Sequence, residues 1–342
     1  MFHFSPRNAL LPSAALAIML GLTACGGGGT DPKPNTLPPS ATPPPAGSTP
    51  PPTTTPPPTT TPPPTTTPPV TTPPPTTPAA VNITGLTDFR STKPNTLVNF
   101  AAATPNTVVE VPITGLLGGD TVVGIDVRPL NGTMYAFARA DVPGSGPTGA
   151  ASIYVINPAT GAASGRIAVT GVTFDTATSV SVDFNPVVDR LRVITFFGQS
   201  TAINVADGVA VASPAVQGTT FAAAIAYSNS AVTATAPAST VLYRIDNQGA
   251  PDDLTTITPA TGAIATTAGP IGFDLNEVQA FDIGGATNEN ALVALRTTAT
   301  GAHTLYRINL TTGAAALFNA TAALSLIGGT AGVPLVDIAI RP

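Results

Sequence analysis

One short phrase decides the fold: Gly124-Ile125-Asp126-Val127-Arg128-Pro129, in which large apolar residues surround an aspartate. Four related copies follow it along the chain, at Ser181-Val182-Asp183-Phe184-Asn185-Pro186, Ile225-Ala226-Tyr227, Ala280-Phe281-Asp282-Ile283 and Val336-Asp337-Ile338-Ala339-Ile340. The copies recur every 43 to 57 residues, which is close to the roughly 40 to 50 residues of one propeller blade. The repeat therefore predicts a ring of similar β units.

Each unit continues past this phrase into further strand patterns. Thr133–Phe137 and Asp189–Ile194 are typical of a second strand, and Gly165–Val169 of a fourth. Between them comes a second signature, in which alternating apolar residues lead into Asn or Asp and Gly, as in a strand entering a hairpin turn. Its copies are Ser152–Gly161, Ala202–Gly208, Val241–Asp246 and Thr304–Gly313. Four antiparallel strands per unit are the content of a propeller blade.

The two ends of the repeat region complete one more unit. Thr96–Phe100 and Thr107–Val111 resemble the second half of a unit, whereas Leu335–Arg341 is a first strand with nothing after it. Joining them closes the ring and removes two open sheet edges. The sequence thus predicts an all-β protein, a β-propeller of five blades with four antiparallel strands each, closed by N- and C-terminal strands. Two stacked β-sandwiches are the alternative, because the spacing of the repeats is unequal.

The N-terminal segment, residues 1–25, predicts a secretory signal. A basic Arg7, an apolar stretch over Ala9–Leu22 and the small residues before Cys25 are typical of such signals. The segment resembles a bacterial lipoprotein signal, and this resemblance implies that Cys25 is acylated. Cys25 is the only cysteine, so it has no disulfide partner within the chain. Because Gly26 follows it where an Asp would resemble an inner-membrane retention signal, we expect an outer-membrane lipoprotein.

Residues 26–80 form a linker between this signal and the repeats at 81–342. Four glycines, Gly26–Gly29, precede a tract of Pro and Thr triplets. Proline fixes φ and lacks an N–H, so the tract is expected to be a disordered, extended polyproline II spacer. Such a spacer reaches on the order of 150 Å. A stalk is the main interpretation, with O-glycosylation or a proline-recognition ligand as alternatives.

A family resemblance rests on the run Val182–Val193 together with Gly124–Pro129. These stretches resemble a bacterial domain-of-unknown-function family, and the similarity spans most of Gly85–Arg341. The resemblance implies secreted or surface proteins with propeller-like repeats. It implies no activity, because the family has none assigned.

Composition excludes several function classes. Thirteen basic residues stand against 18 acidic ones, for a net charge of −5, and no basic cluster exists, so nucleic acid is not expected as a partner. His303 is the only histidine outside the signal, which leaves no zinc motif. Ser200 lies in a stretch that only half resembles a nucleophile elbow, so we interpret Ser200 and His303 as a loop serine and a surface histidine. No catalytic residue and no cofactor is assigned.

The recurring carboxylates Asp126, Asp183, Asp282 and Asp337 are the main candidate site, since inner propeller strands bring them around the central channel. Three interpretations stay open. The carboxylates accept backbone amides or pair with Arg128, Arg190, Arg192 or Arg341; they share a calcium ion; or they act as an acid/base pair on glycosides. Arg190 and Arg192 alternate with apolar residues and point to one face of a strand. They read an anionic ligand or, more economically, pair with Asp183 or Asp189.

The leading functional hypothesis is a lipid-anchored cell-envelope protein with a non-enzymatic propeller that binds or scaffolds an extracytoplasmic ligand or protein. The membrane is then a partner through the lipid at Cys25. Contact regions are expected in Asp141–Ala151, Ala231–Ser239 and Asn247–Leu254, because loops on rigid scaffolds commonly carry recognition. The alternative is an extracytoplasmic hydrolase for glycans or lactones that uses the channel carboxylates, with or without calcium. A purely structural surface protein is the third hypothesis.

Overall fold

The computed structural model describes residues 80–142, 146–175, 179–217, 222–246, 251–275, 280–296 and 302–342. These residues belong to one of the two units into which the chain divides, Pro73–Pro342. The signal, Cys25 and the Pro/Thr tract up to residue 79 lie outside the described residues, so the boundaries predicted for them stay predictions.

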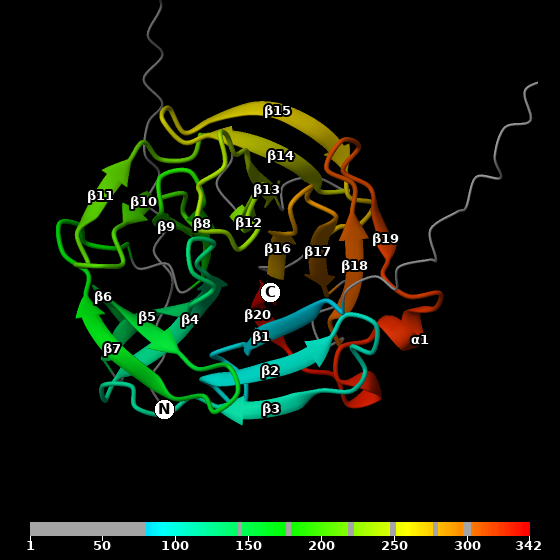
Figure 1. Ribbon diagram of the computed structural model, residues 1–342, viewed down its shortest axis with the longest axis horizontal. Coiled ribbons are helices and arrows are strands. Elements are labelled where there is room, and N and C mark those ends of the chain that lie inside the picture. The colour runs from blue at the N-terminus through cyan, green and yellow to red at the C-terminus, as the bar shows by residue number, and fades with distance from the viewer. Residues whose placement is uncertain are drawn as a thin grey trace, which may run out of the picture. The chain divides into compact units, whose positions relative to one another are not determined.

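Five antiparallel sheets of four strands are arranged around a common axis, which confirms the predicted five-bladed propeller (Figure 1). Blade 1 contains, from the axis outward, β20 (Leu335–Arg341), β1 (Asn82–Thr87), β2 (Thr96–Ala101) and β3 (Val109–Pro112). Blade 2 contains β4 (Asp120–Val127), β5 (Met134–Val142), β6 (Gly146–Ile156) and β7 (Ala163–Ala168). Blade 3 contains β8 (Val180–Asn185), β9 (Arg190–Thr195), β10 (Ser200–Ile203) and β11 (Ala210–Ser213).

Blade 4 contains β12 (Ala222–Tyr227), β13 (Leu242–Asp246), β14 (Asp253–Thr258) and β15 (Ala263–Pro270). Blade 5 contains β16 (Ala280–Gly284), β17 (Asn290–Leu295), β18 (Thr304–Ile308) and β19 (Ala315–Leu317). A short helix α1 (Ala322–Ser325) and a 3-10 turn η1 (Gly329–Ala331) lie in the connection from β19 to β20. The five innermost strands, one from each copy of the repeated phrase, contact their neighbours all around the ring.

The ring closes through its two ends, as the sequence predicts. β20 pairs antiparallel with β1, so that Ile340 lies opposite Ile83 and Asp337 opposite Leu86. Blade 1 therefore takes one strand from the C-terminal end and three from the N-terminal end. The second of these four strands, β1, was not anticipated from the sequence.

The strand predicted from Val241–Asp246 occupies a different place in its blade than expected. It forms β13, the second strand of blade 4, whereas the other copies of that signature form the third strands β6, β10 and β18. The third strand of blade 4 is β14, which leads into Pro259-Ala260-Thr261-Gly262. This turn matches Pro158-Ala159-Thr160-Gly161 after β6, so the turn identifies the third strand better than the apolar alternation does.

The core lies between the blades, where apolar side chains of adjacent sheets pack together. Phe137 and Val123 of blade 2, for example, share one cluster with Val182, Phe184 and Val193 of blade 3. Every residue of β16 is buried. Inner strands covered on both faces lose the usual alternation of apolar and polar residues, which explains the abundance of small apolar residues and the scarcity of charge.

In four of the five blades, a repeated glycine fixes the outer turn against the neighbouring blade. Gly208 has a left-handed φ of 76°, and its carbonyl accepts the Thr170 amide of blade 2 at 3.0 Å. A Cβ on Gly208 would collide with the carbonyl of Ala168. Gly161, Gly262 and Gly313 repeat this conformation and close approach. Only glycine satisfies both conditions.

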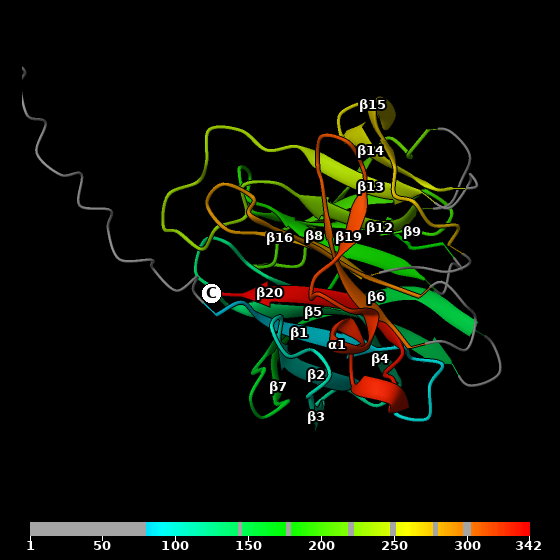
Figure 2. The ribbon, with the colours of Figure 1, turned by 90° about the vertical axis from the view of Figure 1, so that its right-hand side faces the viewer.

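The inner strands all run toward one end of the ring, which we call the tether face. Val127, Asn185, Tyr227, Gly284 and Arg341 are the last residues of these strands. The described chain enters at Ala80 on the same face, since Asn82 pairs with Arg341. Figure 2 shows the C-terminus and the long loop between β12 and β13 on this side of the ring.

Candidate functional site

The four predicted carboxylates lie on the innermost strands. Asp126, Asp183, Asp282 and Asp337 come from β4, β8, β16 and β20, and their exposed fractions are only 6, 2, 5 and 3%. Ala226 takes the fifth position, on β12, as the sequence indicates. The structure therefore brings the four side chains together around the axis, out of contact with bulk solvent.

Each carboxylate accepts a hydrogen bond from the backbone of the next inner strand. The donors are the amides of Phe184 to Asp126 at 2.7 Å, Tyr227 to Asp183 at 3.0 Å, Ile340 to Asp282 at 2.6 Å and Ile125 to Asp337 at 2.9 Å. The acceptor and donor belong to different blades in every case. The carboxylates thus join blade to blade at four of the five junctions around the channel.

Three of the carboxylates also approach one another. Asp126, Asp183 and Asp282 each offer an oxygen, and these oxygens lie within 4.8 Å of one another. Burial raises the pKa of all four carboxyls, and repulsion between like charges adds to the rise for Asp126, Asp183 and Asp337. The pKa of Asp282 rises to about 6, chiefly because of burial. At mildly acidic pH, the carboxyl groups of this cluster therefore bind protons more readily than exposed carboxyls do.

This cluster is where the described chain could hold a divalent cation. Calcium takes six to eight oxygen ligands, and Asp126, Asp183 and Asp282 supply three carboxyl groups toward that number. In the structure, however, one oxygen of each is already directed at a backbone amide. The chemistry of the donor set suits a hard cation, while the observed bonds suit blade attachment.

The missing fifth carboxylate coincides with a long loop between β12 and β13, which we call the strap (Ser228–Val241). The strap reaches across the tether face, where the Thr233 amide donates to the Pro129 carbonyl of blade 2 at 2.9 Å. Toward blade 5, the Asn229 amide donates to the Asn288 side chain at 2.6 Å, and the Asn288 side chain donates back to Asn229 at 3.0 Å. The strap thus ties blade 4 to its neighbour where Ala226 supplies no carboxylate.

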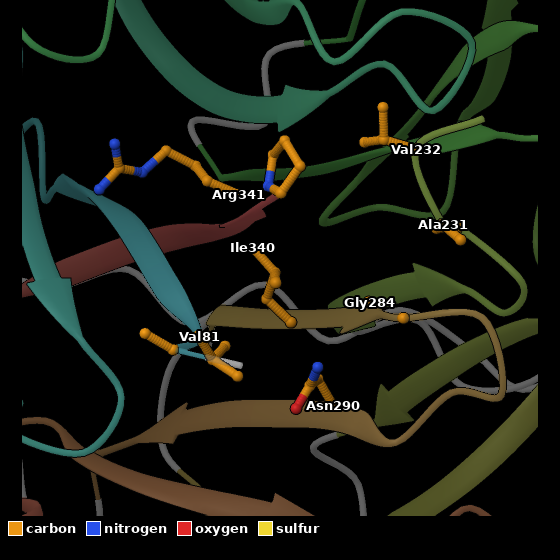
Figure 3. Close-up of a pocket in the computed structure, with 11 residues that line it drawn as sticks. Val81, Ala231, Val232, Gly284, Asn290, Ile340 and Arg341 are labelled. Atoms are coloured by element: carbon orange, nitrogen blue, oxygen red, sulfur yellow. The ribbon is translucent and has the colours of Figure 1, made fainter. Parts of the chain in front are cut away.

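A hollow of about 230 Å³ lies beside the strap at the mouth of the channel, and we call it the cup. Its lining residues are Ala80, Val81, Ser230, Ala231, Val232, Gly284, Gly285, Asn290, Ile340, Arg341 and Pro342. Figure 3 shows the side chains of Val81, Ile340 and Asn290 gathered around one space, while the Arg341 guanidinium extends away from it. The cup is therefore a mainly apolar hollow, with the carboxamide of Asn290 and the polar residue Ser230 in its wall.

A second hollow, of about 580 Å³, borders blade 4. Its lining residues are all uncharged: Asn185, Tyr227, Thr240, Val241, Leu242, Tyr243, Thr256, Ile257, Thr258, Pro259, Ala265 and Thr266. The threonine and tyrosine hydroxyls supply hydrogen-bonding groups without a net charge. Such a lining suits a neutral ligand better than an ion.

The two candidate arginines do not pair with the channel carboxylates. Arg192 is 7% exposed and donates to Tyr227, Ser200 and Ser213 at 3.3, 3.1 and 2.6 Å. Arg190 donates to the carbonyl of Asp189 at 3.2 Å.

The carboxylate of Asp189 instead binds Arg128 of blade 2, with 2.7 Å between Nε and Oδ1. The side chain of Arg128 lowers the pKa of Asp189. The predicted pairing of an arginine with Asp183 is thus replaced by uncharged partners inside the junction of blades 3 and 4.

His303 is not a surface residue, contrary to the interpretation from the sequence. It is 1% exposed, and its Nδ1 accepts the amide of Leu335, the first residue of β20, at 3.2 Å. Burial lowers its pKa to about 4. Ser200 begins β10 and accepts from Arg192, so these two residues lie in separate structural contacts and form no triad with each other.

Sequence reasoning missed the strap contacts and the carboxamide of Asn290. Of the three predicted contact regions, Ala231–Ser239 lies in the strap, and the other two lie only partly within the described residues. The available signal was the unusual length of the segment between Ile225-Ala226-Tyr227 and Val241–Asp246. Nothing in the residue order indicates that this segment bonds to blades 2 and 5.

Fold and site together define a β-propeller whose inner strands are joined by buried carboxylates. The family model described as "Domain of unknown function (DUF4394)" matches residues 96–331. The chain belongs to this family, as the resemblance in the sequence implies. No curated protein matches the chain in sequence.

Several solved structures match the chain at low sequence identity. A protein of unknown function from Bacteroides thetaiotaomicron is 13% identical, over 76% of this chain and 70% of that one, with a TM-score of 0.46. A nidogen/laminin complex is 10% identical, over 77% of this chain and 99% of that one, with a TM-score of 0.40. Among the described residues, no helix has the length and apolar character needed to cross a membrane.

Proposed function

We propose that this protein is a lipid-anchored component of the cell envelope, in which a non-enzymatic propeller binds or scaffolds an extracytoplasmic partner. The propeller is a rigid platform, and the Pro/Thr tract is the spacer that holds it away from the outer membrane. The carboxylates of the channel belong to the platform and carry no reaction.

One observation carries the non-enzymatic part of the proposal. Asp126, Asp183, Asp282 and Asp337 each accept an amide of a neighbouring inner strand. A glycosidase needs two carboxyl groups that flank a bound substrate, and these groups are more than nine-tenths buried. Bonds between blades account for them without a substrate.

The envelope part of the proposal is supported by the sequence alone. The segment up to Cys25 resembles a lipoprotein signal, and the single cysteine follows small residues. Metabolic labelling with a palmitate analogue tests the anchor. We expect the label on the wild-type chain and in the outer-membrane fraction, and its loss in Cys25→Ala. Equal labelling of both chains, or of neither, would contradict the anchor.

The hydrolase alternative is tested on a panel of glycans and lactones with the purified protein. We expect no turnover by the wild type and none by Asp183→Asn, whose amide oxygen still accepts the Tyr227 amide. Exposed Asp274 provides the matched control, Asp274→Asn. Turnover that vanishes in Asp183→Asn but persists in Asp274→Asn, with circular dichroism unchanged in both, would replace the binding function by an enzymatic one.

A further inference from the structure

The cup at the channel mouth has a mainly apolar inner surface. Val81, Val232 and Ile340 supply apolar walls around about 230 Å³. Within the described residues, the side-chain amide of Asn290 makes no hydrogen bond, although Figure 3 shows it directed toward Val81 and Ile340. A hollow of this kind suits an apolar group that carries a hydrogen-bond acceptor.

The chain itself delivers such a group to this place. The described chain begins at Ala80, which lines the cup, and 79 residues precede it. Immediately before Ala80 stand Pro73-Pro74-Pro75-Thr76-Thr77-Pro78-Ala79. Whatever path they take, they start from the wall of the cup.

Proline-rich segments suit the cup chemically. A prolyl residue offers an apolar ring and a carbonyl acceptor but no N–H donor, so it matches the apolar walls and the free Asn290 amide. Polyproline II is preformed, which lowers the entropy lost on docking. A tethered segment also acts at an effective concentration in the millimolar range, so that a weak contact suffices.

We propose that Pro73–Ala79 docks in the cup of its own chain, with a prolyl carbonyl on the Asn290 amide and proline rings against Val81, Val232 and Ile340. Docking fixes the direction in which the tract leaves the propeller. Given the proposed lipid anchor, on which this consequence rests, the tether face then points to the membrane and the opposite face points outward to a partner.

Nuclear magnetic resonance of the mature chain carrying Cys25→Ser tests the docking. One variant carries Pro74→Ser, Pro75→Ser and Pro78→Ser; the matched control carries Pro56→Ser, Pro57→Ser and Pro58→Ser, farther along the same tract. We expect the Asn290 side-chain amide and the methyl groups of Val232 and Ile340 to shift in the first variant only. A blocked peptide of residues 73–79 added to that variant should restore these signals saturably.

Three outcomes would overturn the proposal. If the signals are the same in the wild type and in both variants, the tract does not occupy the cup. If the signals shift equally in both variants, the effect is general to the tract. If the wild-type signals change on dilution, the occupant is a second copy of the chain. Because the test needs no lipid, failure of the anchor at Cys25 leaves its result unaffected, and the two failures are distinguishable.

Discussion

At the scale of single residues, the channel aspartates combine two opposing effects. Burial disfavours ionisation of Asp126, Asp183 and Asp282, and like charges add to this effect for Asp126 and Asp183, while backbone amides stabilise the ionised form. Raised pKa values show which effect dominates. The folded state is therefore more stable when some carboxyls of this cluster are protonated.

This balance predicts that the propeller gains stability on mild acidification. The pKa of Asp282 is about 6 in the folded chain against 3.8 for the free group, so the native state binds its proton more tightly. Its contribution is fully present below about pH 4 and is lost as pH rises through about 6, which amounts to about 3 kcal/mol. Urea unfolding should show a smaller loss over this range in Asp282→Asn than in the wild type or in the Asp274→Asn control.

His303 acts in the opposite direction. Its pKa is lowered to about 4, so the unfolded chain binds a proton that the native chain does not, and stability falls as pH drops from about 6.5. Because His303 is present in both chains, its contribution to the pH dependence of stability cancels when Asp282→Asn is compared with the wild type. The measurement is made after treatment with a chelator. A rise of the melting midpoint on adding calcium would mean that a cation, rather than protons, occupies the cluster.

At the scale of elements, the outer turns of blades 2 to 5 attach each of these blades to the one before it. Gly208 lies against Ala168 with a φ of 76°, whereas Gly165 has a φ of 59° and open space where a Cβ would stand. A side chain at Gly165 would therefore cause backbone strain alone, whereas a side chain at Gly208 would cause both backbone strain and a steric collision. The same turns also show which strand is third in each blade.

We expect Gly208→Ala to destabilise the domain by roughly 2–4 kcal/mol and Gly165→Ala by about 1 kcal/mol. Both substitutions force an alanine into left-handed backbone, but only the first also drives a methyl group into the neighbouring blade. Chemical denaturation of the two variants measures the difference. Equal losses would mean that the outer turn contributes no blade contact.

Strand order within a blade was predictable only in part. The alternating apolar pattern of Val241–Asp246 resembles a third strand but forms β13, because second strands such as β9 alternate in the same way. β1 was missed because Gly85, in the middle of the strand, is a weak strand signal. In both cases the local sequence pattern does not show which strands will pair with the segment in the folded blade.

At the scale of the whole molecule, one strand closes the ring. β20 supplies the inner strand of blade 1, and Ile338 within it is 1% exposed. Its Asp337 carries the bond to Ile125 of blade 2, and its first residue is held by His303. Removing β20 thus removes contacts to blades 1, 2 and 5 at once.

A chain that ends at Pro334 is expected to lose its cooperative unfolding transition, because β1 and the channel-facing sides of two blades lose their cover. A chain that lacks only Pro342 should unfold like the wild type. Thermal unfolding followed by circular dichroism distinguishes them. A cooperative transition in the shorter chain, with a midpoint near that of the wild type, would refute the closure of the ring by β20.

The amino-acid sequence by itself determined the repeat, the number of blades and the aspartates that recur on the inner strands, because these follow from periodicity and from the alternation of apolar residues. The tertiary structure decided what those residues contact. Asp126 bonds to Phe184, 58 positions away, Arg128 binds Asp189 rather than a channel carboxylate, and the strap replaces the missing fifth carboxylate. Such partners come from different blades, and their distances are set only once the ring has closed.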